Sequence, residues 1–330
     1  MTDMVRLQAG GLVGPDNAFH IDAWGKADVN LVTHAHGDHA RSGSAEYWCA
    51  EDCASILRHR LGPDIRLRSL PYRHKARLGK SWVSFHPAGH IRGSAQIRVE
   101  QGSQVWVVTG DYKRDPDPTC EAFERVSCDT LITEATFGLP IYRWSSSATI
   151  AAQIMDWWQE CRREGTTALL FCYALGKAQR ILSELRRFTN DEVLVHGAVA
   201  SLTQIYREQG VPMVPTRLVG EETGLTEGRL VLAPPSAHRS PWMKRFRSVS
   251  TAFASGWMAV RGIRRRHGYQ RGFVLSDHAD WTSLLSTIEE SGASRVLVTH
   301  GNTDALTRFL REVKGVRAES LTTEFGEGED

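Results

Sequence analysis

The sequence contains no apolar run that approaches the ~18 residues of a membrane-spanning helix. Residues 1–10 also lack the continuous apolar core of a secretory signal. We therefore expect a cytoplasmic protein with no membrane partner. Hydrophobic residues form 41% of the chain and charged residues 24%, which is typical of a soluble globular protein. The length of 330 residues fits one large domain or two ordinary ones.

Cysteine is also scarce, with six residues and no C-x-x-C pair. Cys49 and Cys53 are isolated from other sulfur ligands in the sequence, so they do not predict a zinc site. We expect six reduced thiols, several of them buried. The cysteines therefore imply no oxidising compartment.

Acidic residues are absent from one long segment and nearly absent from another. Residues 239–271 contain nine Lys or Arg, including Arg264, Arg265 and Arg266, and no acid. Residues 58–80 contain eight Lys or Arg and a single acid, although the formal net charge of the whole chain is only +2. A basic segment is often just a solvated face, but two of them in one chain favour the binding of a polyanion.

Histidine, by contrast, is concentrated directly after the apolar residues 29–32. Residues 33–39 read T-H-A-H-G-D-H and bring four potential ligands together: His34, His36, Asp38 and His39. Imidazole and carboxylate suit zinc and similar divalent ions, and this set exceeds what one tetrahedral ion can use. The pattern therefore predicts a two-metal site, and enzymes use such sites to hydrolyse phosphate esters and amides. The alternative is a solvated turn that happens to contain histidines.

Short apolar runs alternate with amphipathic segments along the chain. Strands are predicted at 105–109, 130–133, 168–173 and 295–299, and helices at 150–163, 177–188, 281–290 and 304–313. This alternation favours an α/β fold. Potential ligands repeatedly follow the predicted strands, namely His34, Asp111, Glu134, His278 and His300. Because open α/β sheets place their sites at the carboxyl ends of strands, we expect these side chains to converge.

Several motifs together resemble the metallo-β-lactamase fold and its β-CASP nuclease branch. Besides the histidine cluster they are H-I-D at 20–22, P-A-G-H at 87–90, T-G-D at 109–111 and V-T-H-G at 298–301. The resemblance covers nearly the whole chain. It implies an αββα sandwich with a parallel α/β cap domain inserted after an acidic motif.

The acidic motif of that branch corresponds to T-E-A-T-F-G at 133–138, and A-S-G-W at 254–257 would close the insertion. The implied catalytic domain is 1–145 with 255–330, and the implied cap is 146–254. The segment Y-A-L-G-K-A-Q at 173–179 is also similar to the cap of RNA 3′-end cleavage nucleases.

The resemblance further implies two divalent ions, zinc or manganese, held by seven side chains. These are His34, His36 and His90 for one ion, Asp38, His39 and His300 for the other, and Asp111 bridging both. Asp22 would orient a ligand or the bridging water. Glu134 would hold His278, which would protonate the leaving oxygen.

From the residues alone, three of these roles have alternatives. Asp22 after a strand is often a cap. His278 in S-D-H-A-D could form a structural hydrogen bond, and His300 could be a turn histidine. His196 in V-H-G resembles the context of His300, but it falls inside the cap, so we interpret it as groove-lining or structural.

Nucleic-acid contacts are predicted for five residues: Arg41, Lys113, Lys177, His238 and Arg239. Lys177 opens a predicted helix, whose N-terminus favours anions. Arg41 follows the histidine cluster, Lys113 follows Asp111, and His238 follows the P-P break at 234–235. Aromatic residues such as Trp242 could stack on bases, although large aromatics more often belong to a core.

The motifs G-D-Y-K-R-D-P at 110–116 and F-G-L-P-I-Y-R-W at 137–144 are similar to the bacterial ligase-associated DNA exonucleases. This similarity implies DNA repair beside an ATP-dependent DNA ligase and a helicase. His300 instead favours RNA as the substrate, because histidine at this position is typical of the RNA nucleases of the branch. RNA is therefore the alternative substrate. A catalytically inactive nucleic-acid-binding scaffold is disfavoured because every expected ligand is present.

Overall fold

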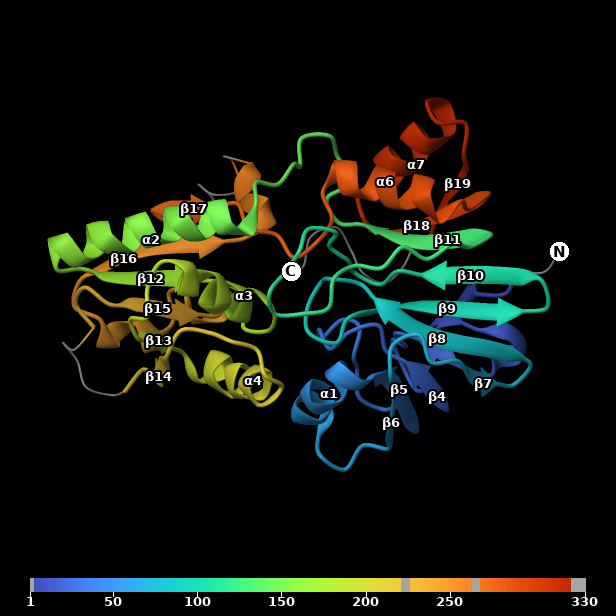
Figure 1. Ribbon diagram of the computed structural model, residues 1–330, viewed down its shortest axis with the longest axis horizontal. Coiled ribbons are helices and arrows are strands. Elements are labelled where there is room, and N and C mark those ends of the chain that lie inside the picture. The colour runs from blue at the N-terminus through green and yellow to red at the C-terminus, as the bar shows by residue number, and fades with distance from the viewer. Residues whose placement is uncertain (1–2, 221–225, 261, 263–267, 322–330) are drawn as a thin grey trace. The chain divides into compact units, whose positions relative to one another are not determined.

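The computed structural model describes residues 3–220, 226–260, 262 and 268–321. The chain divides into two compact units. Unit 1 comprises Met1–Pro116, Cys120–Arg143 and His278–Asp330, and unit 2 comprises Asp117–Thr119 and Trp144–Asp277. The described residues form a mixed α/β structure with three sheets, in line with the expected α/β class (Figure 1).

Unit 1 contains two sheets and three α-helices among its described residues. The first sheet has the order β1-β2-β3-β4-β5-β6, with β1 (Arg6–Gln8), β2 (Gly11–Val13), β3 (His20–Ile21), β4 (Val29–Leu31), β5 (Glu46–Ala50) and β6 (Leu67–Leu70). The second has the order β19-β18-β11-β10-β9-β8-β7, with β7 (Ala76–Leu78), β8 (Ser81–Pro87), β9 (Ala95–Gln101), β10 (Gln104–Val108), β11 (Thr130–Ala135), β18 (Arg295–Gly301) and β19 (Arg317–Ser320). The helices are α1 (Ala54–Leu61), α6 (Trp281–Ser291) and α7 (Thr303–Glu312).

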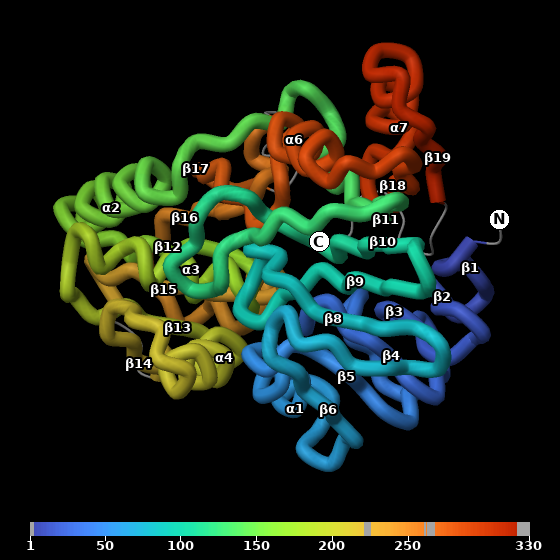
Figure 2. The backbone as a smooth tube through the Cα atoms, turned by 45° about the vertical axis from the view of Figure 1, so that its right-hand side comes forward, coloured from blue at the N-terminus to red at the C-terminus, as the bar shows by residue number. Residues whose placement is uncertain are grey.

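The two sheets of unit 1 pack on one another because their strands alternate in side-chain direction. Ile21 and Leu31 of the first sheet share a buried core with Val108 and its neighbours of the second. The opposite face of the second sheet, which carries Val107 and Leu131, packs against α6 and α7. Figures 1 and 2 both show these two helices beside β18 and β11. The central strands β10, β11 and β18 are therefore largely buried on both faces, which explains their apolar sequences.

Unit 2 is built on one six-stranded parallel sheet. Its order is β14-β13-β15-β12-β16-β17, with β12 (Thr167–Phe171), β13 (Val193–Val195), β14 (Thr216–Leu218), β15 (Leu230–Ala233), β16 (Val249–Ala254) and β17 (Arg271–Phe273). One face packs against α2 (Ser147–Glu164), α3 (Lys177–Glu184) and α4 (Gly197–Glu208). The other face carries Leu169, Phe171 and Phe253 and is covered by the loops and short 3-10 helices that follow β15 and β16.

The strands and helices predicted from periodicity are confirmed within a few residues, as β10, β11, β12, β18, α2, α6 and α7 show. The second unit extends to Asp277, beyond residue 254 where we expected it to end. The reason is that β17 pairs in parallel with β16 and so belongs to the sheet of unit 2.

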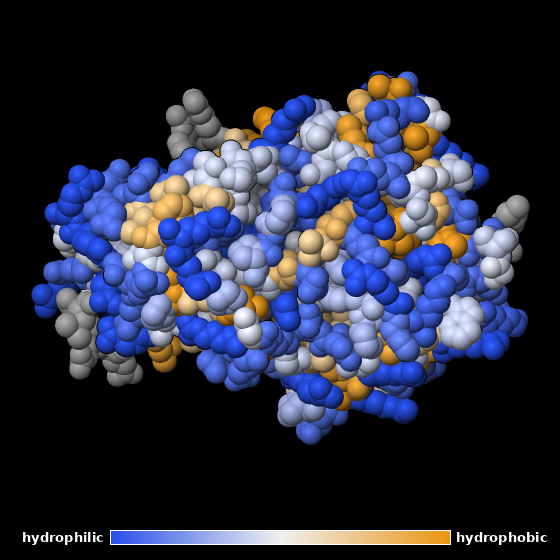
Figure 3. Space-filling model, viewed as in Figure 1, coloured by the Kyte–Doolittle hydropathy of each residue, from blue (hydrophilic) through white to orange (hydrophobic). Residues whose placement is uncertain are grey.

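The face of the molecule in Figure 3 is mostly hydrophilic, with hydrophobic residues scattered over it. None of the helices in the described ranges is long and apolar enough to cross a membrane.

Unit 2 also contains a buried cluster of charged side chains. The Arg180 guanidinium lies 2.5 Å from the Asp117 carboxylate, 3.0 Å from Asp277 Oδ1 and 2.8 Å from the carbonyl oxygen of Ser276. Nζ of Lys177 lies 3.0 Å from Asp277 Oδ2. All four charged residues are at most 8% exposed. Because buried charges require partners, Arg180 is the residue that permits both carboxylates to stay inside the unit.

We expect Arg180→Met to lower the free energy of unfolding by about 3–5 kcal/mol, since it leaves buried carboxylate charge uncompensated. Urea denaturation followed by circular dichroism measures this change. Arg217→Met is the control, because the Arg217 side chain is 57% exposed and pairs with Glu192 at the surface. The control should lose less than about 1 kcal/mol. Equal losses in the two variants would contradict a special role for Arg180.

Candidate metal centre

Four side chains of unit 1 converge in a manner suited to a metal ion. His34 and His36 follow β4, His90 follows β8 and Asp111 follows β10. One ligand atom from each of the four lies within 4.8 Å of all the others. His36 Nδ1 is 3.1 Å from Nε2 of both His34 and His90, and Asp111 Oδ2 is 3.4 Å from His34 Nε2.

These separations fit a divalent cation. A tetrahedral zinc ion with bonds of about 2.0–2.1 Å would hold its ligand atoms roughly 3.3–3.4 Å apart. When the three ring nitrogens are unprotonated, their lone pairs repel one another, and a cation between them would remove that repulsion. The donor set of imidazoles and a carboxylate is one that zinc and manganese accept. The residues present are therefore able to hold a metal ion.

A second set of potential ligands lies on the other side of Asp111. His39 Nε2 is 3.4 Å from Asp111 Oδ2 and 3.5 Å from Asp38 Oδ2. The His300 ring stacks on the His39 ring with centroids 5.2 Å apart. The structure thus brings together all seven side chains expected to hold the two ions, and Asp111 Oδ2 reaches histidines of both sets.

Asp22 lies behind the second set and fixes its geometry. One carboxylate oxygen accepts a hydrogen bond from the Thr33 backbone N–H at 2.8 Å, and the other accepts from Thr33 Oγ1 at 2.6 Å. That second oxygen is also 2.7 Å from His39 Nδ1. These contacts leave His39 Nε2 directed toward Asp38 and Asp111.

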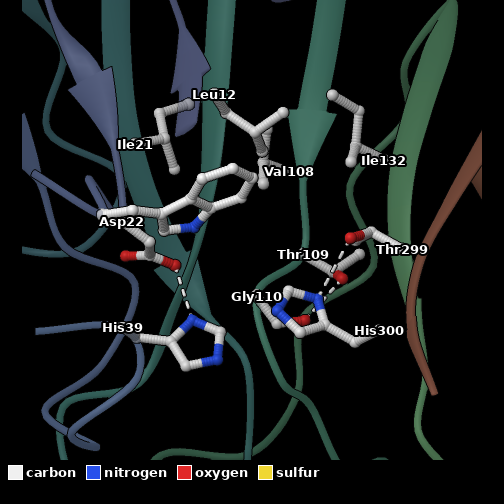
Figure 4. Close-up of a pocket in the computed structure, with 11 residues that line it drawn as sticks. Leu12, Ile21, Asp22, His39, Val108, Thr109, Gly110, Ile132, Thr299 and His300 are labelled. Carbon is white, nitrogen blue, oxygen red and sulfur yellow. Dashed lines mark hydrogen bonds and ion pairs between the residues drawn. The ribbon is translucent and has the colours of Figure 1, made fainter. Parts of the chain in front are cut away.

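Figure 4 shows Asp22 and His39 opposite Thr299 and His300 in a small pocket between the two sheets of unit 1. The inner wall of this pocket is apolar. Two of the polar residues, Asp22 and His300, adopt left-handed backbone conformations with φ of 47° and 58°. Such conformations are costly for residues other than glycine, and they often mark functional sites.

Burial and charge set the protonation of the cluster. Burial and the neighbouring His39 hold the pKa of His34 well below its usual value, which favours the neutral ring that a metal ion would bind. Burial alone would lower the pKa of His39, but the carboxylates of Asp111, Asp38 and Asp22 outweigh it and raise that pKa well above its usual value. Burial would raise the pKa of Asp111, yet His39 and His278 hold it well below its ordinary range. A cation bound at His39 would therefore displace a proton.

Gly110 sets the distance between Asp111 and the histidine loop. Its φ is +55°, and a Cβ atom on Gly110 would lie 2.6 Å from the Thr33 side chain. Only glycine allows this close approach in this conformation. Thr33 also donates a hydrogen bond to Asp22. The contact between Gly110 and Thr33 therefore connects the β10 loop to the residues that position His39.

Glu134 and His278 form a second buried pair in the same unit. The Glu134 carboxylate is 3.1 Å from His278 Nδ1 and accepts a hydrogen bond of 2.8 Å from the Tyr112 backbone N–H. The His278 ring lies 4.7 Å from the His90 ring, centroid to centroid. The arrangement orients the His278 ring beside the ligand set of His34, His36 and His90.

The five residues predicted to contact nucleic acid differ in exposure. Lys113 and Lys177 are 2% and 3% exposed and pair with Asp115 and Asp277. A phosphate contact by either lysine would require it to leave its carboxylate. Arg41 is half-buried, with a 3.4 Å contact to the Trp24 carbonyl oxygen. His238 and Arg239 lie in unit 2, at the end of η4 (Pro235–Ala237).

The residues Arg264, Arg265 and Arg266 of the second basic segment lie outside the described residues.

Three supporting residues have no role that the sequence predicts. Thr33 binds Asp22, and Ser94 Oγ accepts a hydrogen bond from the His90 backbone N–H at 3.1 Å. The Arg60 guanidinium donates to the carbonyl oxygen of Ala35, inside the histidine loop. Thr33 is the first residue of the histidine motif and Ser94 lies close to the motif of His90, but Arg60 reaches its partner across 25 positions, and no local pattern signals such a contact.

We expect His90→Ala to weaken zinc and manganese binding by at least about tenfold, because it removes one of four converging ligands. Competition with a metal-binding dye measures the affinity. His86→Ala is a matched control, since His86 lies on β8, the strand that leads to His90, but contacts Ser84 and Glu124 instead of the cluster. Unchanged affinity in a folded His90→Ala protein would contradict the proposed ligand set.

Comparison with known proteins gives relatives of this chain, although no family model matches it. It is 32% identical over 310 residues to a probable DNA ligase of Opitutus terrae, covering 93% of this chain and 30% of the relative. It is 26% identical over 208 residues to an RNase J-like protein of Methanocaldococcus jannaschii, covering 54% of this chain and 49% of the relative. It is 27% identical over 194 residues to the endoribonuclease YSH1 of Gibberella zeae, covering 47% of this chain and 23% of the relative.

The chain thus spans less than half the length of these curated relatives. A crystal structure of a protein of unknown function from Enterococcus faecalis V583 aligns with a TM-score of 0.57 at 11% identity, covering 91% of this chain and 80% of that one. This structural likeness concerns the fold alone. Together with the motifs, the relatives show that the chain belongs to the β-CASP family of the metallo-β-lactamase fold.

Proposed function

We propose that this chain is a metal-dependent phosphodiesterase that acts as a DNA exonuclease in DNA repair. The observation that carries the proposal is the position of Asp111, whose carboxylate oxygen lies within 3.4 Å of a histidine from each of two ligand sets. A carboxylate shared in this way is what a two-metal hydrolytic centre requires.

The proposed architecture is the αββα sandwich of the metallo-β-lactamase fold with unit 2 as the β-CASP cap. Two observations support it. The sheets of unit 1 pack face to face, with α6 and α7 on the outer face of the second sheet. The chain leaves unit 1 after Arg143 and returns at His278, so the parallel sheet of unit 2 is an insertion that follows Glu134.

In this proposal His34, His36 and His90 would hold one ion, Asp38, His39 and His300 would hold the other, and Asp111 would serve both. When bound, the ions would supply an activated water molecule and neutralise charge on the phosphodiester. Asp22 keeps His39 in the tautomer that offers Nε2 to the cluster, because its carboxylate accepts from Nδ1.

His278 would act as the general acid. Its Nδ1 donates to Glu134, which fixes the ring and stabilises the positive charge that the ring carries when protonated. The proton delivered to the leaving oxygen would then come from Nε2. Glu134 is 1% exposed and therefore interacts with His278 without competition from bulk water.

DNA is favoured as the substrate because the chain aligns over nearly its whole length with part of a protein named as a probable DNA ligase. This alignment also motivates the proposed association with an ATP-dependent DNA ligase and a helicase. RNA is the second candidate, because relatives named endoribonuclease YSH1 and RNase J-like protein align with about half of the chain. The presence of His300 favours the same alternative.

The test is purified protein with Mn²⁺ or Zn²⁺ on single-stranded DNA and RNA of matched sequence, labelled at either end and resolved on a gel. We expect mononucleotides to be released from DNA, and the label position gives the polarity. Cleavage of RNA with inert DNA would instead establish the second candidate. Cleavage of neither substrate by metal-loaded protein would refute both.

We expect His278→Ala to slow cleavage by about 10²–10⁴-fold without loss of bound metal, as removal of a general acid does. Single-turnover rates and the metal content of the same sample measure the two effects. Glu134→Gln should change the rate in the same direction, because it weakens the support of the His278 ring. Since Asp111, Glu134 and His278 also lie within 4.8 Å of one another, metal loss in His278→Ala would make His278 a ligand instead.

A further inference from the structure

Unit 2 carries a group of aromatic and basic side chains that the proposed metal centre does not use. The group consists of the rings of His238, Trp242 and Tyr269 with the cations of Arg239, Lys244 and Arg245, and we call it the aromatic-basic surface. It lies over the sheet face of unit 2 opposite α2, α3 and α4, where Phe171 and Phe253 project from the strands.

The rings form a layered stack on that face. Tyr269 stacks on Phe253 with centroids 5.0 Å apart and an interplanar angle of 23°. His238 stacks on Tyr269 at 4.3 Å and 29°. Trp242 meets His196 edge to face at 4.9 Å. The rings of Phe171 and Phe253 belong to the core. Those of His238, Tyr269 and Trp242 are half-buried and thus present part of their surface to solvent.

The cations stand next to these rings. Arg239 directly follows His238, and its guanidinium packs over Gly268, where a Cβ atom would lie 2.2 Å from a guanidinium nitrogen. The Arg245 guanidinium lies over the Trp242 ring, 5.2 Å from its centroid. Arg239 and Lys244 are exposed. Positive charge therefore alternates with aromatic surface along residues 238–245.

This positive charge is not balanced locally. Residues 239–271 contain no Asp or Glu, and within the described ranges the ion pairs include none for Arg239, Lys244 or Arg245. Other arginines of unit 2 do have acidic partners, as in Arg162–Asp191 at 2.6 Å and Arg271–Glu160 at 2.8 Å. Within the part of the chain that the structure describes, the aromatic-basic surface thus carries a net positive charge that a polyanion would neutralise.

We propose that the aromatic-basic surface binds single-stranded nucleic acid, with bases stacked on Trp242 and the His238–Tyr269 pair and with phosphates on Arg239, Lys244 and Arg245. Stacking platforms combined with cations are the physical requirement for binding single strands without sequence preference. The inference rests on the proposed function for its ligand class, but it concerns binding by residues that are outside the metal centre.

The test measures binding without cleavage. Fluorescein-labelled dT20 and rU20 are titrated with the full-length protein in EDTA, and anisotropy gives Kd at several salt concentrations. Lys244→Gln and Arg239→Gln should each weaken binding by about 3–10-fold and lower the slope of log Kd against log salt by about 0.7. Trp242→Leu should weaken binding by roughly 5–100-fold with little change in slope, because it removes stacking and not charge.

Two control variants match these changes at other sites. Trp82→Leu removes a 47% exposed tryptophan of β8, and Arg163→Gln removes an exposed cation of α2. Both should leave Kd and slope unchanged. Melting temperatures show whether each variant is folded, and the two charge variants decide the question if Trp242→Leu is unstable.

The proposal is overturned if the folded charge variants and Trp242→Leu bind both oligonucleotides as tightly as the wild type. Lack of any binding by the wild type would overturn it as well. Binding by the wild type that depends on this surface, without cleavage of either oligonucleotide when metal is added, would support the surface and refute the nuclease function.

Discussion

The buried charge of Asp111 is the constraint on which the rest of the site depends. A carboxylate that is 5% exposed must be compensated, and here histidines from the β4 loop and the β8 loop surround it. This requirement fixes how closely the β10 loop approaches the β4 loop. Gly110 makes the approach sterically possible because it has no side chain, and the Thr33 side chain that it contacts donates a hydrogen bond to Asp22. The proposed ligands are therefore positioned by one connected set of contacts, not by independent loops.

Much of this organisation could be predicted from the sequence because its signals are local. Buried strands such as β11 and β12 are continuous apolar runs, and the H-x-H-x-D-H cluster lies within one loop. Long-range contacts could not be predicted in this way. Arg180 meets Asp117 and Asp277 across 63 and 97 positions, and the sequence reveals neither pairing. The left-handed conformation of Asp22 likewise follows from its contacts with Thr33 and His39, which form only in the folded unit.

Charge alone was a poor guide to exposure. The sequence predicts a phosphate contact for Lys177 because this residue begins a helix. In the structure, however, Lys177 is buried against Asp277 and lies over the Tyr173 ring. Lys244 lies in a segment without acids and is exposed. The difference is the presence of a carboxylate that can fold inward with the lysine. A basic residue therefore says more about binding when the acids that could neutralise it are absent from its surroundings.

The discontinuity of unit 1 also determines the order in which the chain can fold during synthesis. The central strand β11 is made before unit 2, but its parallel neighbour β18 is made after it. Until then one edge of β11 is unpaired and the apolar face of Leu131 lacks the helices that cover it. Such an edge is prone to aggregate. A chain interrupted directly before β18 would thus combine a complete unit 2 with a unit 1 whose β11 edge is open. Aggregation would then accompany the loss of His300, one of the proposed ligands.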